Sequence, residues 1–579
     1  MQKQLVQLLM DVLQINFKSG DDILVKHLLK EGVEFVFGYP GGAIMPIYDA
    51  LHCYSEQIFH ILTRHEQGAI HAAQGYARVS KNIGVCISTS GPGATNFITG
   101  LADANIDSTP VLCICGQVSS TFLGKNSFQE TNIIDISIPI SKWNVQILLT
   151  QDIGISLQKA FYIINQGRNA PVLIDITKDA QLDKSSIKEA QYMVEFSKID
   201  CYCPTIKISA SILEKSRELI KSSKKTFVLV GQGIILAKAE KELKKFIEKA
   251  DLPFASTLLA IDAIDSTNPL FMGMLGMHGG YVTNLLTNQC DVLIAIGMRF
   301  DDRVTGDINR YACKAKIIHI DIDPCEIDKQ INCHLSIVGN SKQNLLLITE
   351  NLQKTTKKVW VDIFYHIKKC EEKIIIRDLY PEYEMLSMGE VIKCINTYKD
   401  KDAILITDVG QHQMMSSRYF YFSHRNCKIT SGGLGTMGFS LPAAIGAQLS
   451  SRERQIICIV GDGGLQMTLQ EFGTILQNKL PIKIILLNNS FLGMVRQWQE
   501  LFFERRYAFT KLINPDFIQL VRSYKIGSKK VLNRKSLNQE IKKMLQNTCA
   551  YFLEVVVEKE DNVFPMISTG TSVDEIRLN

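Results

Sequence analysis

The feature that most constrains this chain of 579 residues is a pair of short polar motifs, each placed directly after an apolar run. Gly-Asp-Gly at 461–463 follows the run 455–460, and Asn-Asn at 488–489 follows the run 483–487. A segment of helical length separates the two motifs. This order predicts a βαβ unit of an open parallel sheet, in which ligands bind at the carboxyl ends of the strands.

The residue types at these strand ends point to a metal-bound diphosphate. A glycine turn lets backbone N–H groups approach a phosphate, and the start of the next helix adds the positive end of its dipole. Mg²⁺ prefers oxygen ligands, which the carboxylate of Asp462 and the amide of Asn489 can supply. Either motif alone is a common turn dipeptide. Both together, at the ends of successive strands, predict a magnesium diphosphate site.

Composition excludes several classes of protein. The chain is 46% hydrophobic and 21% charged, which fits about three to four soluble domains. A net charge of +5 without a basic block argues against a nucleic-acid partner. The fifteen cysteines include no Cys-x-x-Cys pair, and many lie in apolar runs, so we expect reduced thiols and a cytoplasmic protein. Residues 1–17 predict an amphipathic extension, and no membrane span is expected.

Apolar runs alternate with helical segments along most of the chain, which is typical of parallel sheets. They form three blocks, at 19–180, 208–353 and 387–558. A Lys/Ser-rich stretch at 181–207 predicts a linker, and a Lys/Glu-rich stretch at 354–386 predicts a helical connector. We therefore predict an α/β protein with three doubly wound parallel-sheet domains.

A glycine-rich loop in the third block allows a competing prediction. Gly-Leu-Gly-Thr-Met-Gly at 433–438 satisfies the G-x-G-x-x-G pattern of a dinucleotide site and precedes a helical segment. The acid that should bind the ribose about twenty residues later is not in place, because Glu453 and Asp462 flank a strand instead of ending a second one. The pattern alone is therefore weak support for a Rossmann site.

The motif pair at 461–463 and 488–489 resembles the signature of thiamine diphosphate enzymes. The resemblance implies that Asp462, Asn489 and a carbonyl near Phe491 bind Mg²⁺, which holds the cofactor's diphosphate. It gives Glu66 the role of the carboxylate at the aminopyrimidine ring, on which proton transfer depends. As a surface residue at a helix start, Glu66 also has a purely local explanation. The first and third blocks would bind the pyrimidine and diphosphate ends.

The middle block carries further polar strand ends. Gly231 and Gly233 follow one apolar run. Arg299 and Arg303 follow a second, and Asp321 ends a third. Acids at such positions can bind ribose hydroxyls, and arginines can bind phosphate or flavin oxygens. For any one segment, paired surface charges are the simpler explanation. Together the segments resemble the FAD-binding middle domain of the acetohydroxyacid (acetolactate) synthase family.

The resemblance to the catalytic subunit of that family extends over nearly the whole chain after Ser19. The motifs that carry it are at 37–43, 64–67, 89–96, 128–130, 171–175, 178–179, 275–279, 299–303, 408–413 and 492–498. It implies condensation of two pyruvates to acetolactate with loss of CO₂, or of pyruvate with 2-ketobutyrate. These reactions open valine, leucine and isoleucine synthesis. In this family FAD is structural and is not a redox partner.

The same resemblance assigns site residues position by position. Near the reacting centre it places Glu66, Gly42 and Gln129. It assigns contacts with thiamine diphosphate to Glu66, Gln411, His412, Gly435, Met437, Gly461, Gly463 and Met494. Contacts with FAD fall to Arg168, Gly231, Gly233, His278, Gly297, Arg299, Asp301 and Asp321. The keto-acid substrates would meet Lys178, Met277, Asp302, Arg303 and Trp498. The metal site comprises Asp462, Asn489 and Phe491.

Some positions depart from the family pattern. Gly280 stands where Thr is common, Asn340 where Asp follows Gly, and Asn-Ala at 169–170 where Pro-Gly is usual, so the FAD edge is less well defined than the thiamine core. The residues that follow 566–570 are atypical too, which leaves the order of a C-terminal lid open. The resemblance also implies a homodimer with sites at the subunit interface and a small regulatory subunit.

Three alternative functions remain at this stage. A pyruvate oxidase would share thiamine diphosphate, Mg²⁺ and FAD but would pass electrons to the flavin. Glyoxylate carboligase lacks the carboxylate that Glu66 provides. A non-catalytic regulatory homologue would have no need of intact Glu66, Asp462 and Asn489.

Overall fold

A computed structural model of the chain describes residues 16–187, 208–423 and 427–579. The chain folds into two compact units. Unit 1 comprises Met1–Cys203, Gly433–Arg452 and Thr468–Leu480, and unit 2 comprises the remainder. Most of the predicted N-terminal extension and of the 181–207 linker lies outside the described residues. The described part of that linker contains a short strand, β8 (Lys184–Ile187), which pairs with β1 (Asn16–Ser19).

Unit 1 is built on one parallel sheet of six strands in its described part, in the order β3-β2-β4-β5-β7-β6. The strands are β2 (Phe35–Gly38), β3 (Phe59–Leu62), β4 (Gly84–Ser88), β5 (Val111–Gln117), β6 (Trp143–Ile147) and β7 (Val172–Thr177). Its helices are α2 (Gly20–Lys30), α3 (Met45–Cys53), α4 (Glu66–Ser80), α5 (Pro92–Thr95), α6 (Ile98–Ile106), α7 (Ile133–Ser137), α8 (Ile153–Asn165), α9 (Lys178–Leu182), α20 (Ser440–Ser450) and α22 (Phe472–Gln477). Every residue of β4 and β5 is buried, as expected for strands covered on both faces.

Helix α20 belongs to unit 1 although it lies far along the sequence. It packs on α4 through glycines, because a Cβ at Gly75 would lie 2.0 Å from the carbonyl oxygen of Ala443. A Cβ at Gly446 would lie 1.8 Å from the carbonyl oxygen of Ala72. Side chains at these two positions would therefore separate the helices.

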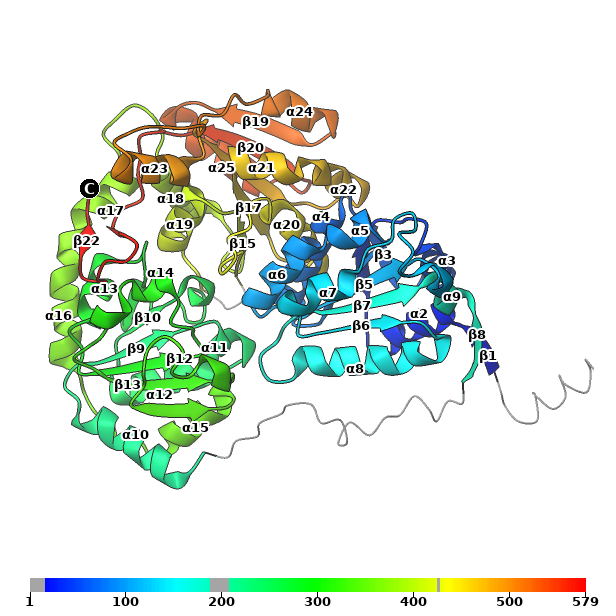
Figure 1. Ribbon diagram of the computed structural model, residues 1–579. Coiled ribbons are helices and arrows are strands. Elements are labelled where there is room, and N and C mark those ends of the chain that lie inside the picture. Colours follow the sequence, from blue (N-terminus) through cyan, green and yellow to red (C-terminus); the bar gives the residue numbers. More distant parts are fainter. Residues whose placement is uncertain (1–15, 188–207, 424–426) are drawn as a thin grey trace, which may run out of the picture. The chain divides into compact units, whose positions relative to one another are not determined.

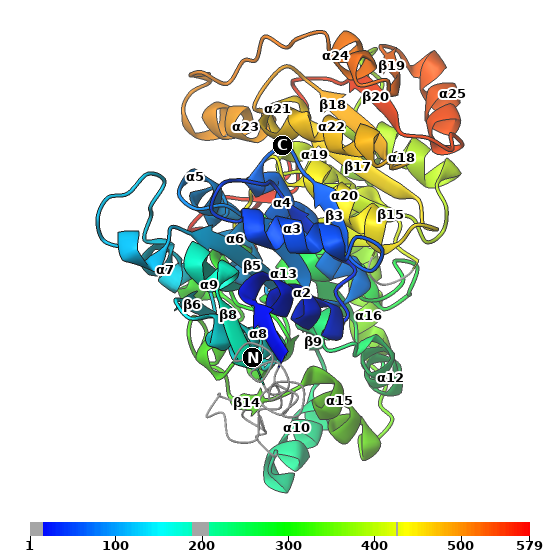
Figure 2. The ribbon, with the colours of Figure 1, turned by 90° about the vertical axis from the view of Figure 1, so that its right-hand side faces the viewer.

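Unit 2 contains two parallel sheets of six strands among its described residues (Figure 1). The central sheet comprises β9 (Thr226–Val230), β10 (Phe254–Ser256), β11 (Phe271–Met274), β12 (Val292–Ile296), β13 (Lys316–Asp321) and β14 (Leu335–Val338). The last sheet comprises β15 (Ile404–Thr407), β16 (Lys428–Thr430), β17 (Ile456–Gly461), β18 (Lys483–Asn488), β19 (Gly527–Val531) and β20 (Tyr551–Val556). Figure 2 shows β17, β18 and β20 side by side, as their register requires.

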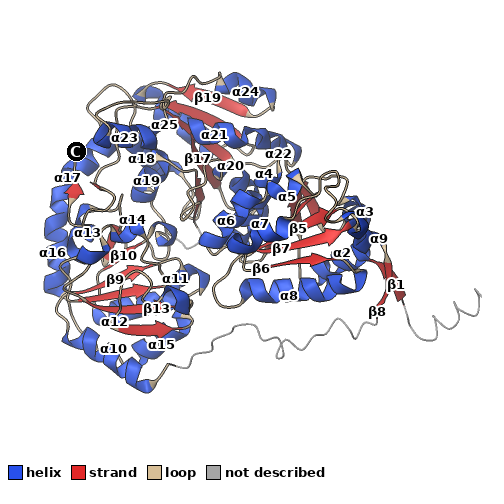
Figure 3. Cartoon of the chain, in the orientation of Figure 1, coloured by secondary structure: helices blue, strands red, loops and turns tan. Residues whose placement is uncertain are grey.

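Helices flank both sheets of unit 2 (Figure 3). With the central sheet go α10 (Ala210–Ser222), α11 (Gly233–Leu236), α12 (Glu240–Ala250), α13 (Tyr281–Thr287), α14 (Asp302–Thr305) and α15 (Ser341–Glu350). The connector forms α16 (Lys358–Lys368) and α17 (Glu372–Leu379), and the remaining helices are α18 (Met388–Tyr398), α19 (Gln411–Tyr419), α21 (Asp462–Thr468), α23 (Gly493–Phe502), α24 (Phe517–Ser523) and α25 (Arg534–Leu545). None of the helices in the described ranges is long and apolar enough to cross a membrane.

Helix α12 illustrates how the sequence selects these elements. Its buried residues are Leu243, Phe246, Ile247 and Ala250, at the i, i+3, i+4, i+7 spacing of one helical face. The rest of the helix is mostly Lys and Glu. Burial of each large apolar side chain stabilises the fold by about 2 kcal/mol relative to exposure.

Strand order distinguishes the central sheet from the other two. Numbered along the sequence, its strands lie in the order 3-2-1-4-5-6, which is the arrangement of dinucleotide-binding sheets. The sheet of unit 1 and the last sheet share a different order, 2-1-3-4-6-5. The prediction of an α/β protein with three doubly wound parallel sheets is confirmed, and the connector at 354–386 is helical as predicted. The exact domain boundaries stay predictions.

Two local expectations differ from the structure. The segment between the Gly-Asp-Gly and Asn-Asn motifs is not one helix but two, α21 and α22, because a short 3-10 turn at Leu469–Glu471 separates them. The C-terminal residues form an ordered antiparallel ribbon of β21 (Met566–Ile567) and β22 (Ile576–Arg577). This ribbon packs against the central sheet side of unit 2, where the N–H of Asp307 donates to the carbonyl of Thr571 at 2.9 Å.

Candidate active site

The predicted metal residues meet at the carboxyl ends of β17 and β18 in unit 2. Asp462 is the first residue of α21 and is 2% exposed, and Asn489 follows β18 and is 8% exposed. The side-chain oxygen of Asn489 accepts the N–H of Phe491 at 3.1 Å. No cluster of three or more His, Cys, Asp or Glu side chains suited to a metal occurs in the described residues. A cation here would therefore depend on one carboxylate, amide and backbone oxygens, and other ligands, which is the coordination that Mg²⁺ tolerates.

Glycines at these strand ends make room for polar side chains. A Cβ at Gly461 would lie 3.0 Å from Cε1 of His412, and one at Gly464 would lie 2.3 Å from Oδ1 of Asp408. Both side chains follow β15, which neighbours β17 in the sheet. The strand order reverses between β15 and β17, and open α/β sheets bind ligands at such a point.

The charges of this site also favour a cation and a phosphate. Burial raises the pKa of Asp462 to about 6, although Asn514 and nearby backbone N–H groups lower it. Burial lowers the pKa of His412 to about 4, so this imidazole is neutral at pH 7. Its Nε2 is buried without a hydrogen-bond partner in the described structure. A buried carboxylate and an unsatisfied ring nitrogen fit a site built for a metal-bound diphosphate.

Sequence reasoning missed Asn514, which holds Asp462 in place. Its Nδ2 donates to Oδ2 of Asp462 at 2.7 Å and to Oδ1 of Asn488 at 3.1 Å. Gln466 donates in turn to Oδ1 of Asn514 at 3.1 Å. Asn514 lies on a loop that pairs with the metal loop through a bridge between Phe491 and Lys511. No local pattern marks such contacts, because the partners are 26 to 52 residues apart.

Glu66 is the first residue of α4 in unit 1 and is 8% exposed. Asn96 donates from Nδ2 to Oε2 of Glu66 at 2.9 Å. The neighbouring Gly93 leaves space beside the carboxylate, since a Cβ there would lie 3.2 Å from Oε1. Burial and a fixed orientation contradict the explanation of Glu66 as a surface residue. Asn96 ends the motif at 89–96, but sequence reasoning gave it no role.

Four other predicted residues, from the N-terminal segment, also lie in unit 1. Gly42 follows β2, and a Cβ there would meet nothing within 4 Å. Gln129 adopts a positive φ of 59°, and its backbone packs against Gly91. Lys178 begins α9. Arg168 donates from Nε to the hydroxyl of Ser108 at 2.8 Å.

The glycine-rich loop at 433–438 belongs to unit 1 as well. Gly435 has a φ of 70°, which suits glycine, and Met437 is half-buried. The loop follows β16, an edge strand, whereas a dinucleotide turn follows the first, central strand of its sheet. The structure therefore does not favour a Rossmann site at this loop.

The two units thus divide the predicted thiamine residues. Glu66, Gly435 and Met437 lie in unit 1. Unit 2 contains the metal residues together with Gln411, His412, Gly461, Gly463 and Met494.

At the point where the central sheet reverses its strand order, glycines let two backbone segments touch. Gly231 follows β9, and a Cβ there would lie 2.2 Å from the carbonyl oxygen of Gly297, which follows β12. Gly233 approaches Gly297 in the same way, at 2.6 Å from its Cα. Gly297 has a φ of 58°. Open α/β sheets bind dinucleotides in the crevice at this point, outside the carboxyl ends of the strands, which here are β9 and β12.

Charged residues surround that crevice. Arg299 follows β12 and is half-buried. Asp301 caps α14 by accepting the N–H of Arg303 at 3.0 Å, and burial raises its pKa while Arg299 lowers it. Asp321 ends β13 and is buried. Burial lowers the pKa of His278 to about 3, and Arg418 donates to its carbonyl at 2.8 Å.

The structure brings together four of the five predicted substrate residues. Met277 forms a small apolar cluster with Phe564 and Met566, against which Trp498 packs. Nη1 of Arg303 lies 3.6 Å from the sulfur of Met277. Asp302 lies 3.7 Å from Arg303 in an exposed ion pair, which contributes little to stability. Lys178, the fifth, lies in unit 1.

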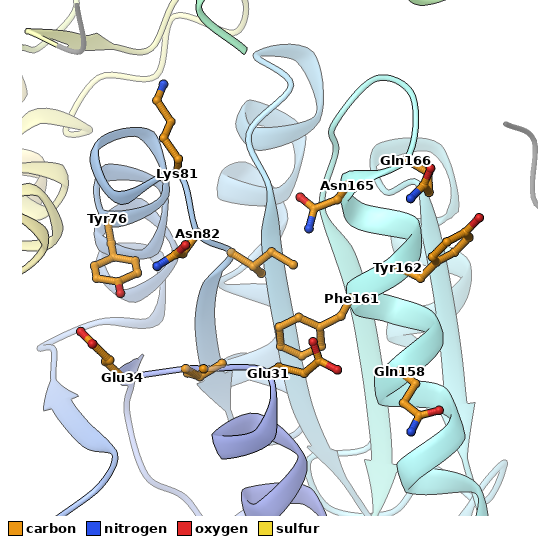
Figure 4. Close-up of a pocket in the computed structure, with 13 residues that line it drawn as sticks. Glu31, Glu34, Tyr76, Lys81, Asn82, Gln158, Phe161, Tyr162, Asn165 and Gln166 are labelled. Carbon is orange, nitrogen blue, oxygen red and sulfur yellow. The ribbon is translucent and has the colours of Figure 1, made fainter. Parts of the chain in front are cut away.

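Unit 1 also contains a hollow of about 590 Å³, whose lining includes none of the predicted site residues of that unit (Figure 4). Its lining includes Glu31, Glu34 and Asn82, which precede β2 and β4, and Phe161 of α8. These residues lie at the amino ends of the strands, whereas Gly42 and Glu66 follow carboxyl ends. The hollow is therefore not part of the candidate cofactor site.

Comparisons with known proteins agree with this geometry. The chain matches the family models of the thiamine pyrophosphate enzyme N-terminal TPP binding domain at 18–136, central domain at 213–348 and C-terminal TPP binding domain at 408–555. These matches place it in the class of thiamine pyrophosphate enzymes.

Three relatives within that class are acetolactate synthase large subunits. The acetolactate synthase large subunit of Cyanidium caldarium is 40% identical, with 96% of both chains covered. The isozyme 2 large subunit of Escherichia coli is 39% identical over 96% of this chain and 99% of its own. The large subunit of Haemophilus influenzae is 38% identical over 97% and 98%. The chain belongs to the family of acetolactate synthase large subunits.

Proposed function

We propose that this chain is the catalytic subunit of an acetolactate synthase, which condenses pyruvate with a second pyruvate or with 2-ketobutyrate at the start of branched-chain amino acid synthesis. The observation that supports this most directly is the placement of Asp462 and Asn489 after the neighbouring strands β17 and β18 of the last sheet, together with a buried, oriented Glu66. A non-catalytic homologue would gain nothing from burying either carboxylate, because burial of a charge costs free energy.

Thiamine diphosphate, when bound, supplies the carbon that adds to the keto group of pyruvate and takes up the electron pair released with CO₂. Asp462, Asn489 and the backbone at Phe491 would hold Mg²⁺ and, through it, the diphosphate. His412 and the turn at Gly461 would line the same end. Met437 would pack against the cofactor.

Glu66 would serve in proton transfer. Asn96 occupies Oε2, which leaves Oε1 as the oxygen that can share a proton with the aminopyrimidine N1′ of the cofactor. The burial of Glu66 excludes water from this exchange. Gly42 and Gln129 would lie near the reacting carbon.

The remaining residues would bind FAD and the substrates. FAD would occupy the crevice at Gly231 and Gly297, where backbone N–H groups and Arg299 can meet its phosphates. Arg303 would bind the carboxylate of the second keto acid, and Trp498 would form an apolar wall beside it. Lys178, Met277 and Asp302 would border the entry.

A product assay separates this function from its alternatives. The purified chain is incubated with pyruvate, thiamine diphosphate, Mg²⁺ and FAD, and acetolactate is expected. Anaerobic reduction of the flavin by pyruvate would instead identify a pyruvate oxidase. Carboligation of glyoxylate in place of pyruvate would identify a glyoxylate carboligase, and a chain that binds no thiamine diphosphate would be a non-catalytic homologue.

We propose further that the active unit is a homodimer, in which Glu66 of one chain meets the cofactor held by Asp462 of the other. Mixing inactive Glu66→Gln and Asp462→Ala chains should then restore activity in heterodimers with one intact site. No recovery after verified subunit exchange would place each site within one chain. A small regulatory subunit completes the proposal, because the similar proteins are named large subunits. The cytoplasm is the proposed location, and all cysteines in the described ranges are free thiols.

A further inference from the structure

Gln497 is a fully buried amide on α23 that the functions proposed above leave unused. Its Oε1 accepts the backbone N–H of Val563 at 2.9 Å, and its Nε2 donates to the carbonyl of the same residue at 3.1 Å. Nε2 also contacts the sulfur of Met566 at 3.4 Å. A backbone N–H can only donate and a carbonyl can only accept, so Val563 fixes which way this amide points.

The oriented Oε1 of Gln497 then fixes a second amide. Nε2 of Gln411 donates to it at 3.1 Å and also donates to the carbonyl of Asp561 at 3.0 Å. With its nitrogen held by two acceptors, Gln411 must turn its oxygen the other way. That oxygen accepts from Nδ2 of Asn489 at 3.4 Å.

The third amide in the series is that of Asn489. With its nitrogen turned toward Gln411, its oxygen is the atom available to a metal, and the N–H of Phe491 supports the same orientation from the other side. Gly493, the first residue of α23, leaves room for the series. A Cβ there would lie 2.2 Å from Oε1 of Gln411 and 2.8 Å from Nδ2 of Asn489.

We propose that Gln497 is a positioning residue for the metal: through Gln411 it holds Asn489 with its oxygen presented to Mg²⁺, and it does so only while the segment from Asp561 to Met566 is in place. The inference rests on the proposed function. It links the C-terminal segment to the diphosphate end of the site by hydrogen bonds between named atoms, without direct contact between Gln497 and the metal.

The test is a titration of Mg²⁺ into the full-length protein with FAD and saturating thiamine diphosphate. Binding is measured by calorimetry and by the shift in melting temperature. Gln497→Met keeps the length of the side chain but removes both polar atoms. Partners of metal ligands typically affect metal affinity by 10–100-fold, so we expect half-saturation at roughly 10–100-fold higher Mg²⁺. The kcat for acetolactate at saturating Mg²⁺ should change less than about 3-fold.

Gln448→Met is the matched control. Gln448 is also a buried glutamine, and its Nε2 donates only to the backbone carbonyls of Ser451 and Arg452, at 3.3 and 3.4 Å. Its replacement removes a similar buried amide in unit 1, so it should lower stability without changing the half-saturation for Mg²⁺.

Gln497→Glu supplies an independent measurement, because a carboxylate still accepts from Gln411 and from the N–H of Val563. Its loss of Mg²⁺ affinity should be clearly smaller than that of Gln411→Glu, which removes the donor to Asp561 and to Gln497. Comparing Gln497→Glu with Gln411→Glu tests the proposal even if Gln497→Met does not fold.

Two results would overturn the proposal while leaving the proposed function standing. One is an unchanged Mg²⁺ titration in Gln497→Met, and the other is an equal loss in Gln497→Glu and Gln411→Glu. A wild-type protein that binds neither Mg²⁺ nor thiamine diphosphate would overturn both.

Discussion

Glu66 and Asp462 make an instructive pair, because the two sheets that carry them have the same strand order. Each is the first residue of a helix and is buried, and each accepts a hydrogen bond from an asparagine amide. Asn96 donates to Glu66 at 2.9 Å, and Asn514 donates to Asp462 at 2.7 Å. Both sheets therefore use the same means to hold a carboxylate.

The difference lies in what surrounds each carboxylate. Asp462 follows β17 at the switch point, and Asn489 follows the neighbouring strand β18, so oxygen ligands can converge there. Glu66 follows β3, an edge strand, and its near neighbour is Gly93. In the proposed function, one local arrangement therefore serves metal binding in one place and proton transfer in the other, according to the groups around it.

The largest expected effect concerns proton transfer by Glu66 and would separate this carboxylate from Asp462. Glu66→Gln should keep the cofactor bound but slow the exchange of its C2 proton by roughly 10²–10⁴-fold, because an amide cannot share a proton as a carboxylate does. Proton NMR of C2 exchange in deuterated solvent measures this rate. Exchange at the wild-type rate would remove Glu66 from the mechanism.

Asp462→Asn should instead impair metal binding. We expect Mg²⁺ affinity to fall by about 100-fold, because the site loses its carboxylate ligand. Since the pKa of Asp462 is raised to about 6, protons compete with Mg²⁺ as the pH falls through 6 in the wild-type protein. The variant should lose this pH dependence. Calorimetric titrations at pH 5.5 and 7.5 measure both effects, and a variant that keeps the pH dependence would assign it to another group.

Replacing Asn514 or Asn96 tests whether the two carboxylates have separate roles. Asn514→Ala should weaken Mg²⁺ binding by roughly 10-fold and leave C2 exchange almost unchanged at saturating Mg²⁺. Asn96→Ala should do the reverse, slowing exchange by roughly 10-fold without affecting Mg²⁺. The two assays above serve both variants. If both asparagines affected the same assay, the two carboxylates would not have separate roles.

Trp498 packs with Met277 and Phe564, and its replacement should affect only the choice of the second substrate. 2-Ketobutyrate exceeds pyruvate by one methylene, which an apolar pocket distinguishes by about 1–3 kcal/mol. Trp498→Leu should lower the ratio of acetohydroxybutyrate to acetolactate at equal substrate concentrations, by roughly 10-fold, with C2 exchange unchanged. An unchanged ratio with a lower melting temperature would make Trp498 a packing residue for Met277 and Phe564 only.

Much of this fold is predictable because parallel strands are short, apolar and followed by turns. The apolar runs at 455–460 and 483–487 match β17 and β18 to within one residue at each end. The predicted placement of Asp462 and Asn489 at strand ends follows from the same local signal and is confirmed. The joining of α20 and α22 to unit 1 has no such signal, since it depends on contacts between residues hundreds of positions apart.

Residues of the candidate site that depend on distant contacts were likewise not predictable from the sequence. Resemblance supplied Glu66 and Arg303, but Asn514 and Gln497 were missed because their role depends on hydrogen bonds to distant loops. An isolated Asn or Gln looks the same in sequence whether it faces solvent or orients a metal ligand. The order of the C-terminal ribbon was also open, since it is held by side chains such as Arg310, which pairs with Asp307 at 2.9 Å and with Glu575 at 2.5 Å.

The close packing of α4 on α20 has a consequence for the growing polypeptide. The face of α4 around Gly75 is covered by Ala443 and Gly446, which a ribosome adds roughly 360 residues after α4 is complete. At about 5–20 residues per second, that interval lasts roughly 20 to 70 seconds. Throughout it the first six-stranded sheet carries an uncovered helix, so nascent chains of this protein should need a chaperone until residue 450 has left the exit tunnel.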